Sequence, residues 1–198
     1  TALFYQNYDE LIKDHSFEDI VANVYLPLLK EIGLLWQTLA LKPVHEHFIS
    51  GLITQKLIEN TSLLQKNITF QEKDFVFVLF LPENEVHEIT ILYINYLLQS
   101  KGYKTIYLGA SVPIEDLKEL QLFYETIYYV SHFTVAPTTE YINTYINCFE
   151  DIFLQNKSKL FVSGAQSFYI TPNRKQVIVA NSIEAIINEI KSEKLFFV

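Results

Sequence analysis

The sequence of 198 residues contains a single cysteine, a single tryptophan, no methionine and only five glycines. One cysteine, Cys148, excludes an internal disulfide and a cysteine-based metal cluster, and we therefore expect a cytoplasmic protein. No apolar run reaches the roughly 18 residues of a membrane span, and no signal peptide is recognisable, so no membrane partner is expected. The formal net charge of −8 argues against nucleic-acid binding by this chain alone, because a phosphate backbone favours a surplus of Lys and Arg.

Hydrophobic residues make up 49% of the chain and charged residues 19%, a composition typical of a globular protein. The 15 Phe and 13 Tyr could line a large cavity, or they could simply fill a core and an interface. Because the chain begins at Thr1 and contains no methionine, we expect it to be a fragment of a longer protein.

Helical patterns dominate residues 1–70. A first helix is predicted near 5–13. Ser16 is a candidate N-cap for a second helix over 17–32, which Pro27 should kink or divide. A third helix is predicted over 44–64, with Pro43 in its first turn. Helices of this number and length predict a small bundle.

Strand and helix patterns alternate over residues 71–198. Strands are predicted at 75–81, 104–109, 127–133, 159–164 and 176–180, with helices near 87–101, 114–122, 138–155 and 182–192. Strands that are apolar on both faces and separated by helices predict a parallel sheet covered on both sides. The expected fold class is therefore α/β: a small N-terminal helical bundle, then a doubly wound, flavodoxin-like five-stranded parallel sheet. Such sheets bind ligands beyond the carboxyl ends of their strands.

Glu85 and His87 stand in the loop after the first predicted strand, where a sheet of this kind binds its ligand. A carboxylate beside an imidazole accepts one ring N–H, fixes the tautomer and strengthens the other nitrogen as a metal ligand. The spacing alone leaves two interpretations open, a solvated pair or a supported ligand.

The surrounding segment "EVHEIT…LLQSKGYKTIYLGASVPIEDL" resembles the cobalamin-binding domain, with its Asp-x-His-x-x-Gly loop, helix, "GY" turn and strand ending in Leu-Gly. Glu85 replaces the usual Asp, His87 matches the lower axial ligand, and Thr90 stands where the family usually has Gly. Later, Ser131 matches the family's Ser-x-Leu strand end, and the pair 163–164, Ser-Gly, replaces its usual Gly-Gly.

The resemblance implies a cobalamin bound base-off, with His87 as the cobalt ligand in place of dimethylbenzimidazole. It also implies that Ser131 contacts the buried base, and that Gly109 and Gly164 leave room for the nucleotide tail. Thr90 and Ser163 place side chains at positions where the family's glycines let the cofactor approach the backbone closely. His132, beside Ser131, is expected to serve local packing.

A second resemblance lies in the helical half, in "WQTLALKPVHEHF". Trp36 followed by Glu46 and His47 is similar to the cap of light-sensing MerR-class transcription regulators of the CarH-like group. There the Trp and the Glu-His pair cover the 5′-deoxyadenosyl group of adenosylcobalamin. An indole can stack on that group, and Glu and His can hydrogen-bond it. Gln37 stands where the group has the His that replaces the adenosyl group after illumination, and an amide is a poorer cobalt ligand.

These resemblances imply a non-enzymatic sensory and oligomerisation module of a transcription regulator, with residues 1–70 capping a cofactor bound by 71–198. The expected cofactor is adenosylcobalamin, a light response being an open question. Self-association as a dimer or tetramer is expected, with DNA bound only through an upstream helix-turn-helix absent from this chain. Two alternatives stay open: a corrinoid methyl carrier of a methyltransferase system, and a degenerate module that no longer binds cobalamin.

Overall fold

A computed structural model describes residues 1–38, 40–71, 75–180, 185 and 188–189, except for the side chain of Gln37. These residues form two compact units, Thr1–Asn67 and Ile68–Val198. No helix within the described residues is long and apolar enough to cross a membrane.

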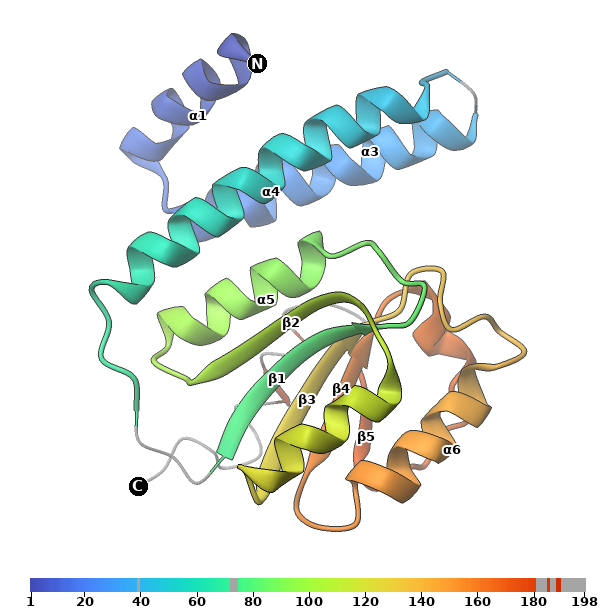
Figure 1. Ribbon diagram of the computed structural model, residues 1–198. Coiled ribbons are helices and arrows are strands. Elements are labelled where there is room, and N and C mark those ends of the chain that lie inside the picture. The colour runs from blue at the N-terminus through green and yellow to red at the C-terminus, as the bar shows by residue number, and fades with distance from the viewer. Residues whose placement is uncertain (39, 72–74, 181–184, 186–187, 190–198) are drawn as a thin grey trace. The chain divides into compact units, whose positions relative to one another are not determined.

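The first unit is helical, as predicted (Figure 1). Its elements are α1 (Ala2–Asp14), α2 (Phe17–Ile20), the π-helix η1 (Val21–Tyr25), α3 (Leu26–Gln37) and α4 (Pro43–Gln65). Ser16 is the N-cap of α2, and its side-chain oxygen accepts a hydrogen bond from the backbone N–H of Asp19. Pro43 occupies the first turn of α4, where its missing N–H costs nothing.

Pro27 marks a boundary between helix types. The π-helix ends just before α3, and the N–H of Leu26 bonds the carbonyl of Val21, five residues earlier. A proline inside an α-helix removes one hydrogen bond and crowds the carbonyl four residues earlier. The wider π turn directly before Pro27 lies where that strain would fall.

The core of this unit contains a partly buried cation. The ammonium of Lys56 lies 4.3 Å from the centre of the Tyr8 ring and 2.8 Å from the Glu59 carboxylate. Around it, Ile53 and Leu57 are fully buried. The positive charge is therefore compensated by an aromatic face and a carboxylate.

The second unit confirms the predicted five-stranded parallel sheet, whose strand order is β2-β1-β3-β4-β5. Its strands are β1 (Phe75–Pro82), β2 (Thr105–Val112), β3 (Thr126–His132), β4 (Lys159–Ser163) and β5 (Val177–Val179). Helix α5 (Ile89–Ser100) covers one face, while α6 (Ile142–Phe153) and the 3₁₀ helix η2 (Ile114–Leu122) cover the other (Figure 1). A second 3₁₀ helix, η3 (Ala165–Tyr169), follows β4. From β1 the chain moves to β2 on one side, then crosses back to β3 on the other side of β1 and continues outward to β4 and β5. The topological switch point therefore lies between β1 and β3.

Two helix predictions need correction. The helix expected near 114–122 is 3₁₀ rather than α. The helix expected from residue 138 begins only at Ile142, and no side chain caps it. Residues 139–141 form a turn instead, which a hydrogen bond from the Tyr141 N–H to the Thr138 carbonyl closes. The helix expected at 182–192 lies largely outside the described residues.

Candidate functional site

The loop after β1 carries the candidate site and ends at α5. The loop begins with a tight turn, in which the backbone N–H of Glu85 donates to the Pro82 carbonyl at 3.0 Å. Asn84 has a positive φ of 67°, a conformation that asparagine tolerates better than most residues. The N–H of Asn84 donates to the Ser111 hydroxyl, and the N–H of Ser111 donates to the Glu85 carbonyl. These bonds fix the loop against the end of β2.

The Glu85 side chain is fully buried (0% exposed) and accepts hydrogen bonds on both carboxylate oxygens. Oε1 accepts from the N–H groups of Val86 and His87 at 3.0 and 3.1 Å and from the His87 ring. Oε2 accepts from three consecutive backbone N–H groups of the loop after β3, those of residues 134, 135 and 136, at 2.8, 2.6 and 3.0 Å. One carboxylate thus joins the two loops at the switch point.

The charge of Glu85 is stabilised by these donors. Burial alone would raise its pKa, but the N–H groups of Ala136 and Val135 and the bond from His87 lower the pKa to about 2. Hydrogen bonds to a carboxylate favour its charged form in this way. At neutral pH Glu85 is therefore a buried anion at the carboxyl ends of the strands.

His87 is half exposed, with 52% of its side chain accessible, and its Nδ1 lies 2.5 Å from Oε1 of Glu85. The ionised carboxylate can only accept, so Nδ1 carries the proton. In the tautomer with a proton on Nδ1 alone, Nε2 carries the lone pair and is free to bind a ligand outside the loop. A carboxylate behind an imidazole is the support that metal-binding histidines commonly have. No group of three or more His, Cys, Asp or Glu within the described residues could hold a metal ion.

Gly109 lies at an irregularity in β2, where the register with β1 shifts beside Phe80. Its φ is 82°, and a Cβ there would lie 3.8 Å from the carboxylate of Glu88. The constraint on this glycine is therefore its backbone conformation rather than lack of space. The Tyr107 hydroxyl donates to the same Glu88 oxygen at 2.9 Å. Thr90 is half-buried in the first turn of α5.

Ser131 and His132 end β3 beside this loop. The buried Ser131 hydroxyl donates to the carbonyl of Phe80 in β1 at 2.7 Å, which leaves its oxygen able to accept one bond from a ligand. Nδ1 of His132 lies 2.7 Å from the Ser163 hydroxyl in β4. Burial lowers the His132 pKa to about 4, so the ring is neutral at pH 7. His132 thus links two strand ends.

Gly164 follows β4 with a φ of 98°. A Cβ at this position would lie 2.8 Å from both C and N of Phe133 and closer still to its carbonyl oxygen. The backbone of Phe133 therefore fills the space that the missing side chain leaves, and glycine is required here for close packing of two loops.

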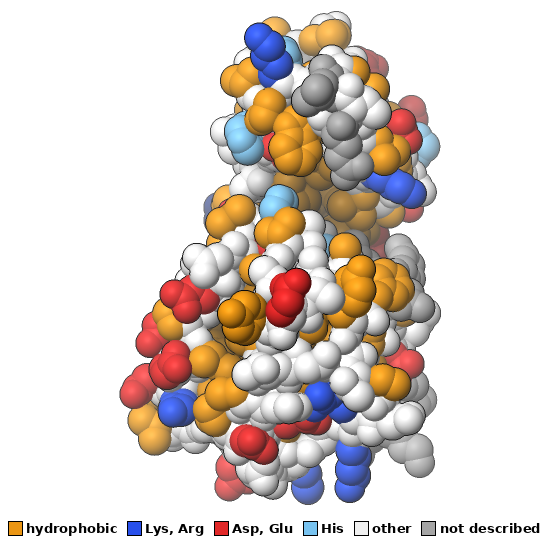
Figure 2. Space-filling model, turned by 90° about the vertical axis from the view of Figure 1, so that its right-hand side faces the viewer, with side chains coloured by type: hydrophobic (Ala, Val, Ile, Leu, Met, Phe, Trp, Pro, Cys, Tyr) orange, Lys and Arg blue, Asp and Glu red, His pale blue; other side chains and the backbone are white. Residues whose placement is uncertain are grey.

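Large apolar side chains are exposed on the segments around the carboxyl ends of the strands. Val86 follows β1, Leu108 lies near the end of β2, Val135 follows β3, and Phe168 follows β4. Hydrophobic side chains are visible at the surface of both units in Figure 2. An exposed apolar rim around a histidine suits a large, partly apolar ligand better than a bare metal ion.

The three candidate residues of the helical unit lie near the loop between α3 and α4. Trp36 is 47% exposed in the last turn of α3, and Nδ1 of His47 lies 2.8 Å from the Glu46 carboxylate in the first turns of α4. Exposed Val44 and Phe48 flank this pair. The side chain of Gln37 lies outside the described part of the structure.

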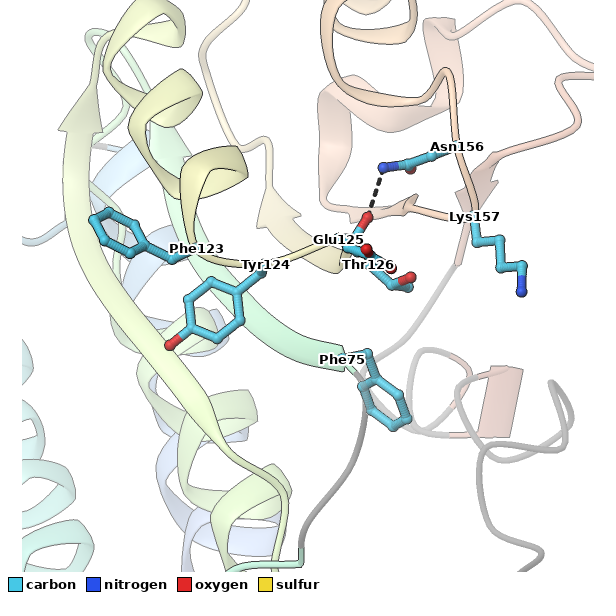
Figure 3. Close-up of a pocket in the computed structure, with 7 residues that line it drawn as sticks. All are labelled: Phe75, Phe123, Tyr124, Glu125, Thr126, Asn156 and Lys157. Atoms are coloured by element: carbon cyan, nitrogen blue, oxygen red, sulfur yellow. Dashed lines mark hydrogen bonds between the residues drawn. The ribbon is translucent and has the colours of Figure 1, made fainter.

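A pocket of about 740 Å³ lies elsewhere on the second unit. Phe75 begins β1, Thr126 begins β3, and Lys157 precedes β4, so this pocket lies at the amino ends of the strands. Figure 3 shows its lining, in which the Asn156 amide donates to the Glu125 carbonyl at 2.6 Å. The candidate site is at the opposite, carboxyl ends.

Known proteins resemble this chain both in sequence and in fold. Residues 3–58 match the family of the B12 binding domain. The chain is also 31% identical over 102 residues to the HTH-type transcriptional repressor CarH of Myxococcus xanthus. That match covers 52% of this chain and only 31% of CarH.

The fold of the whole chain is similar to that of the Methanosarcina barkeri monomethylamine corrinoid protein. The TM-score is 0.74 at 14% sequence identity, over 93% of this chain and 88% of the other. This likeness confirms the fold class predicted from the sequence. The resemblance to cobalamin-binding proteins is confirmed by the match of residues 3–58 to the B12 binding domain.

Sequence reasoning found Glu85 and His87 but missed the backbone partners of the carboxylate. Residues 134–136, which follow β3, are Thr, Val and Ala, and nothing in these residue types shows that their backbone N–H groups donate to Glu85. The sequence predicts a packing role for His132, and its bond to Ser163 fits that role. The cofactor roles predicted for the site residues stay predictions.

Proposed function

We propose that this chain is the cobalamin-binding sensory and oligomerisation module of a transcription regulator, and that His87 is its lower cobalt ligand. The observation that carries the proposal is the pair formed by His87 and Glu85: a half-exposed imidazole whose Nδ1 is bonded to a buried, ionised carboxylate. One imidazole cannot hold a free metal ion, but it can complete the coordination of a metal already held in a macrocycle.

The residues around His87 fit such a macrocycle. Nε2 supplies one neutral nitrogen ligand, Glu85 holds the ring in the tautomer that frees it, and exposed Val86 and Val135 offer apolar contacts to a corrin. The Ser131 hydroxyl, which here donates to the Phe80 carbonyl, would turn to donate to the ring nitrogen of the displaced base. When bound, cobalamin would supply a cobalt–carbon bond that light or chemistry can cleave.

The upper ligand is proposed to be 5′-deoxyadenosyl. Trp36 offers an exposed aromatic face, and the adjacent pair of Glu46 and His47 offers hydrogen-bonding groups. An aromatic face and such a pair suit an adenosine, which stacks and both donates and accepts hydrogen bonds. The helical unit would then cap the upper face of the cofactor.

The regulatory part of the proposal is supported by the similarity to CarH, named as an HTH-type transcriptional repressor. The chain would act as a cofactor-bound sensor in the cytoplasm and not as a catalyst. It would self-associate as a dimer or tetramer, so that several DNA-binding units, carried upstream in a longer protein, engage DNA together.

A corrinoid methyl carrier is the second candidate function. The likeness in fold to the monomethylamine corrinoid protein favours it. A carrier must leave its upper cobalt face open to partner enzymes, whereas Trp36, Glu46 and His47 suit a bulky upper ligand. Preference for adenosylcobalamin over methylcobalamin would therefore distinguish the sensor from the carrier.

The test is a visible absorption spectrum of the purified chain mixed in the dark with adenosylcobalamin. We expect a base-off spectrum with histidine on cobalt, which His87→Ala abolishes and the control His15→Ala preserves. His15 is exposed and lies outside both candidate sites. Retention of cobalamin by His87→Ala with an unchanged spectrum would refute His87 as the ligand.

The same samples would then be illuminated and run on a size-exclusion column. A change of assembly with light would establish a photosensor despite Gln37. Binding without such a change would leave a light-independent sensor or a carrier. A chain that retains no cobalamin would be a degenerate module.

A further inference from the structure

The pocket of about 740 Å³ at the amino ends of the strands is lined by both aromatic and charged side chains. We call it the amino-end pocket. Its lining residues are Phe75, Phe123, Tyr124, Glu125, Thr126, Asn156 and Lys157 (Figure 3). Pockets that hold small organic molecules have volumes of this order. The cobalamin proposal gives this pocket no role, because the candidate site lies at the opposite ends of the strands.

Two opposite charges line the amino-end pocket without being paired. The Glu125 carboxylate and the Lys157 ammonium do not form an ion pair with each other, and neither group has another partner among the described residues. Both side chains are exposed, so each charge is accessible to a ligand. The pocket therefore offers an acceptor for an ammonium group and a donor for a carboxylate.

The backbone that carries these two charges is fixed by side-chain hydrogen bonds. The Asn156 amide donates to the Glu125 carbonyl at 2.6 Å, and the Asn156 side-chain oxygen accepts from the Ser158 N–H at 2.7 Å. The hydroxyl of buried Ser158 accepts from the Ile127 N–H at 2.9 Å. The segment that leads into β3 and the loop before β4 are thereby held side by side. This preorganisation reduces the entropy lost when a ligand contacts both segments.

Aromatic rings form the apolar part of the pocket. The Phe75 ring meets Tyr128 edge-on, with 4.9 Å between the ring centres, which holds it at the start of β1. Phe123 and Tyr124 are 76% and 38% exposed, and Leu122 beside them is 75% exposed. Three consecutive exposed apolar residues form a surface patch of the kind that marks ligand grooves and interaction sites.

We propose that the amino-end pocket binds a small aromatic zwitterion, of which a free aromatic amino acid is the simplest example. The ammonium group of the ligand pairs with Glu125, its carboxylate pairs with Lys157, and its ring stacks on the aromatic side chains of the pocket. A ligand with only one of the two charges satisfies only one of these side chains. This binding site is additional to the proposed cobalamin site.

Binding in this pocket does not depend on a corrinoid. Phe75 begins β1 and Thr126 begins β3, and the loops joined by Glu85 follow the far ends of these strands. The two strands have 8 and 7 residues, a length of roughly 20–25 Å. A ligand in the amino-end pocket is therefore out of reach of His87, and His87→Ala should bind it as the wild-type chain does.

The experiment is a ligand-observed NMR titration of the purified chain, without cobalamin, using three probes. L-Phenylalanine carries both charges, 3-phenylpropionate lacks the ammonium group, and phenethylamine lacks the carboxylate. We expect phenylalanine to bind about fivefold more tightly than either single-charge probe, because each exposed ion pair contributes modestly to affinity.

Charge-removing variants assign each contact. Lys157→Gln and Glu125→Gln should each weaken phenylalanine binding about fivefold. Lys157→Gln should not weaken phenethylamine binding, and Glu125→Gln should not weaken binding of 3-phenylpropionate. The matched controls are Lys118→Gln and Glu119→Gln, both exposed on η2 and outside the pocket lining, and these should bind phenylalanine as the wild-type chain does.

Two results would overturn the assignment of a zwitterion. One is equal affinity of the wild-type chain for all three probes, and the other is unchanged phenylalanine binding in both Lys157→Gln and Glu125→Gln. Absence of saturable phenylalanine binding would overturn the site itself. None of these results would bear on cobalamin binding, which the absorption spectrum tests separately.

Discussion

Replacing Glu85 by glutamine tests whether one carboxylate holds the two loops of the site together. Three N–H donors face each carboxylate oxygen. Whichever way the substituted amide were placed, its NH₂ group would face three donors, and one side of the junction would lose its acceptor. We therefore expect both a loss of stability and a misplaced His87 ring.

The magnitude follows from the pKa. The Glu85 pKa falls from 4.5 to about 2, and at about 1.4 kcal/mol for each pKa unit this corresponds to about 3 kcal/mol of stability in the charged form. Because the pKa is lowered in the folded state, this contribution is complete above about pH 4.5. It is lost as the pH falls from there toward 2.

The assay is urea unfolding of Glu85→Gln beside Glu83→Gln, both at pH 7, with a pH series on the wild-type chain. Glu83 lies in the same loop but is exposed, so its substitution should change the free energy of unfolding by less than about 0.5 kcal/mol. Glu85→Gln should lose about 3 kcal/mol. A difference between the two variants below about 1 kcal/mol would refute the assigned role of the carboxylate.

Two further substitutions test other parts of the structure. Gly164→Ala should destabilise the chain by about 3 kcal/mol in urea unfolding, because its φ of 98° and the Phe133 backbone exclude a Cβ. Gly51→Ala, in α4 with open space around it, should instead stabilise by about 0.5–1 kcal/mol, and equal effects would contradict the packing argument. Trp36→Ala should weaken adenosylcobalamin binding about fivefold in a competition assay, from about 1 kcal/mol of lost stacking. Methylcobalamin binding and the neighbouring control Leu35→Ala should be unaffected.

Sequence patterns were sufficient for the architecture of the second unit. The buried strand from Phe75 is apolar on both faces, and its alternation with helix patterns implied the parallel sheet and its switch point. Helix types and ends were less predictable. Residues 139–141 form a turn before α6 rather than its first turn, and the Thr139 hydroxyl there donates to Gln166, which is distant in sequence.

Some parts of the candidate site were also predictable from the sequence, and others were not. His87 and Glu85 were predictable because both partners are side chains two residues apart. The donors of residues 134–136 were not, because a backbone N–H becomes a donor to Glu85 only once the fold brings the loop after β3 beside it. The role of Gly164 also needed the structure, since Phe133, and not an open slot, fills its side-chain space.

The π-helix before Pro27 has a consequence for the angular position of the residues after it. A π turn holds one residue more than an α turn, so it shifts the phase of every later side chain by about 100° around the helix axis. The face on which α3 presents Trp36, relative to the buried face of α2, is therefore set by the five residues Val21–Tyr25. An α-helical path through the same number of residues would turn Trp36 by about 100° around the axis, whereas deleting one residue there would remove the π turn and leave Trp36 on nearly the same face.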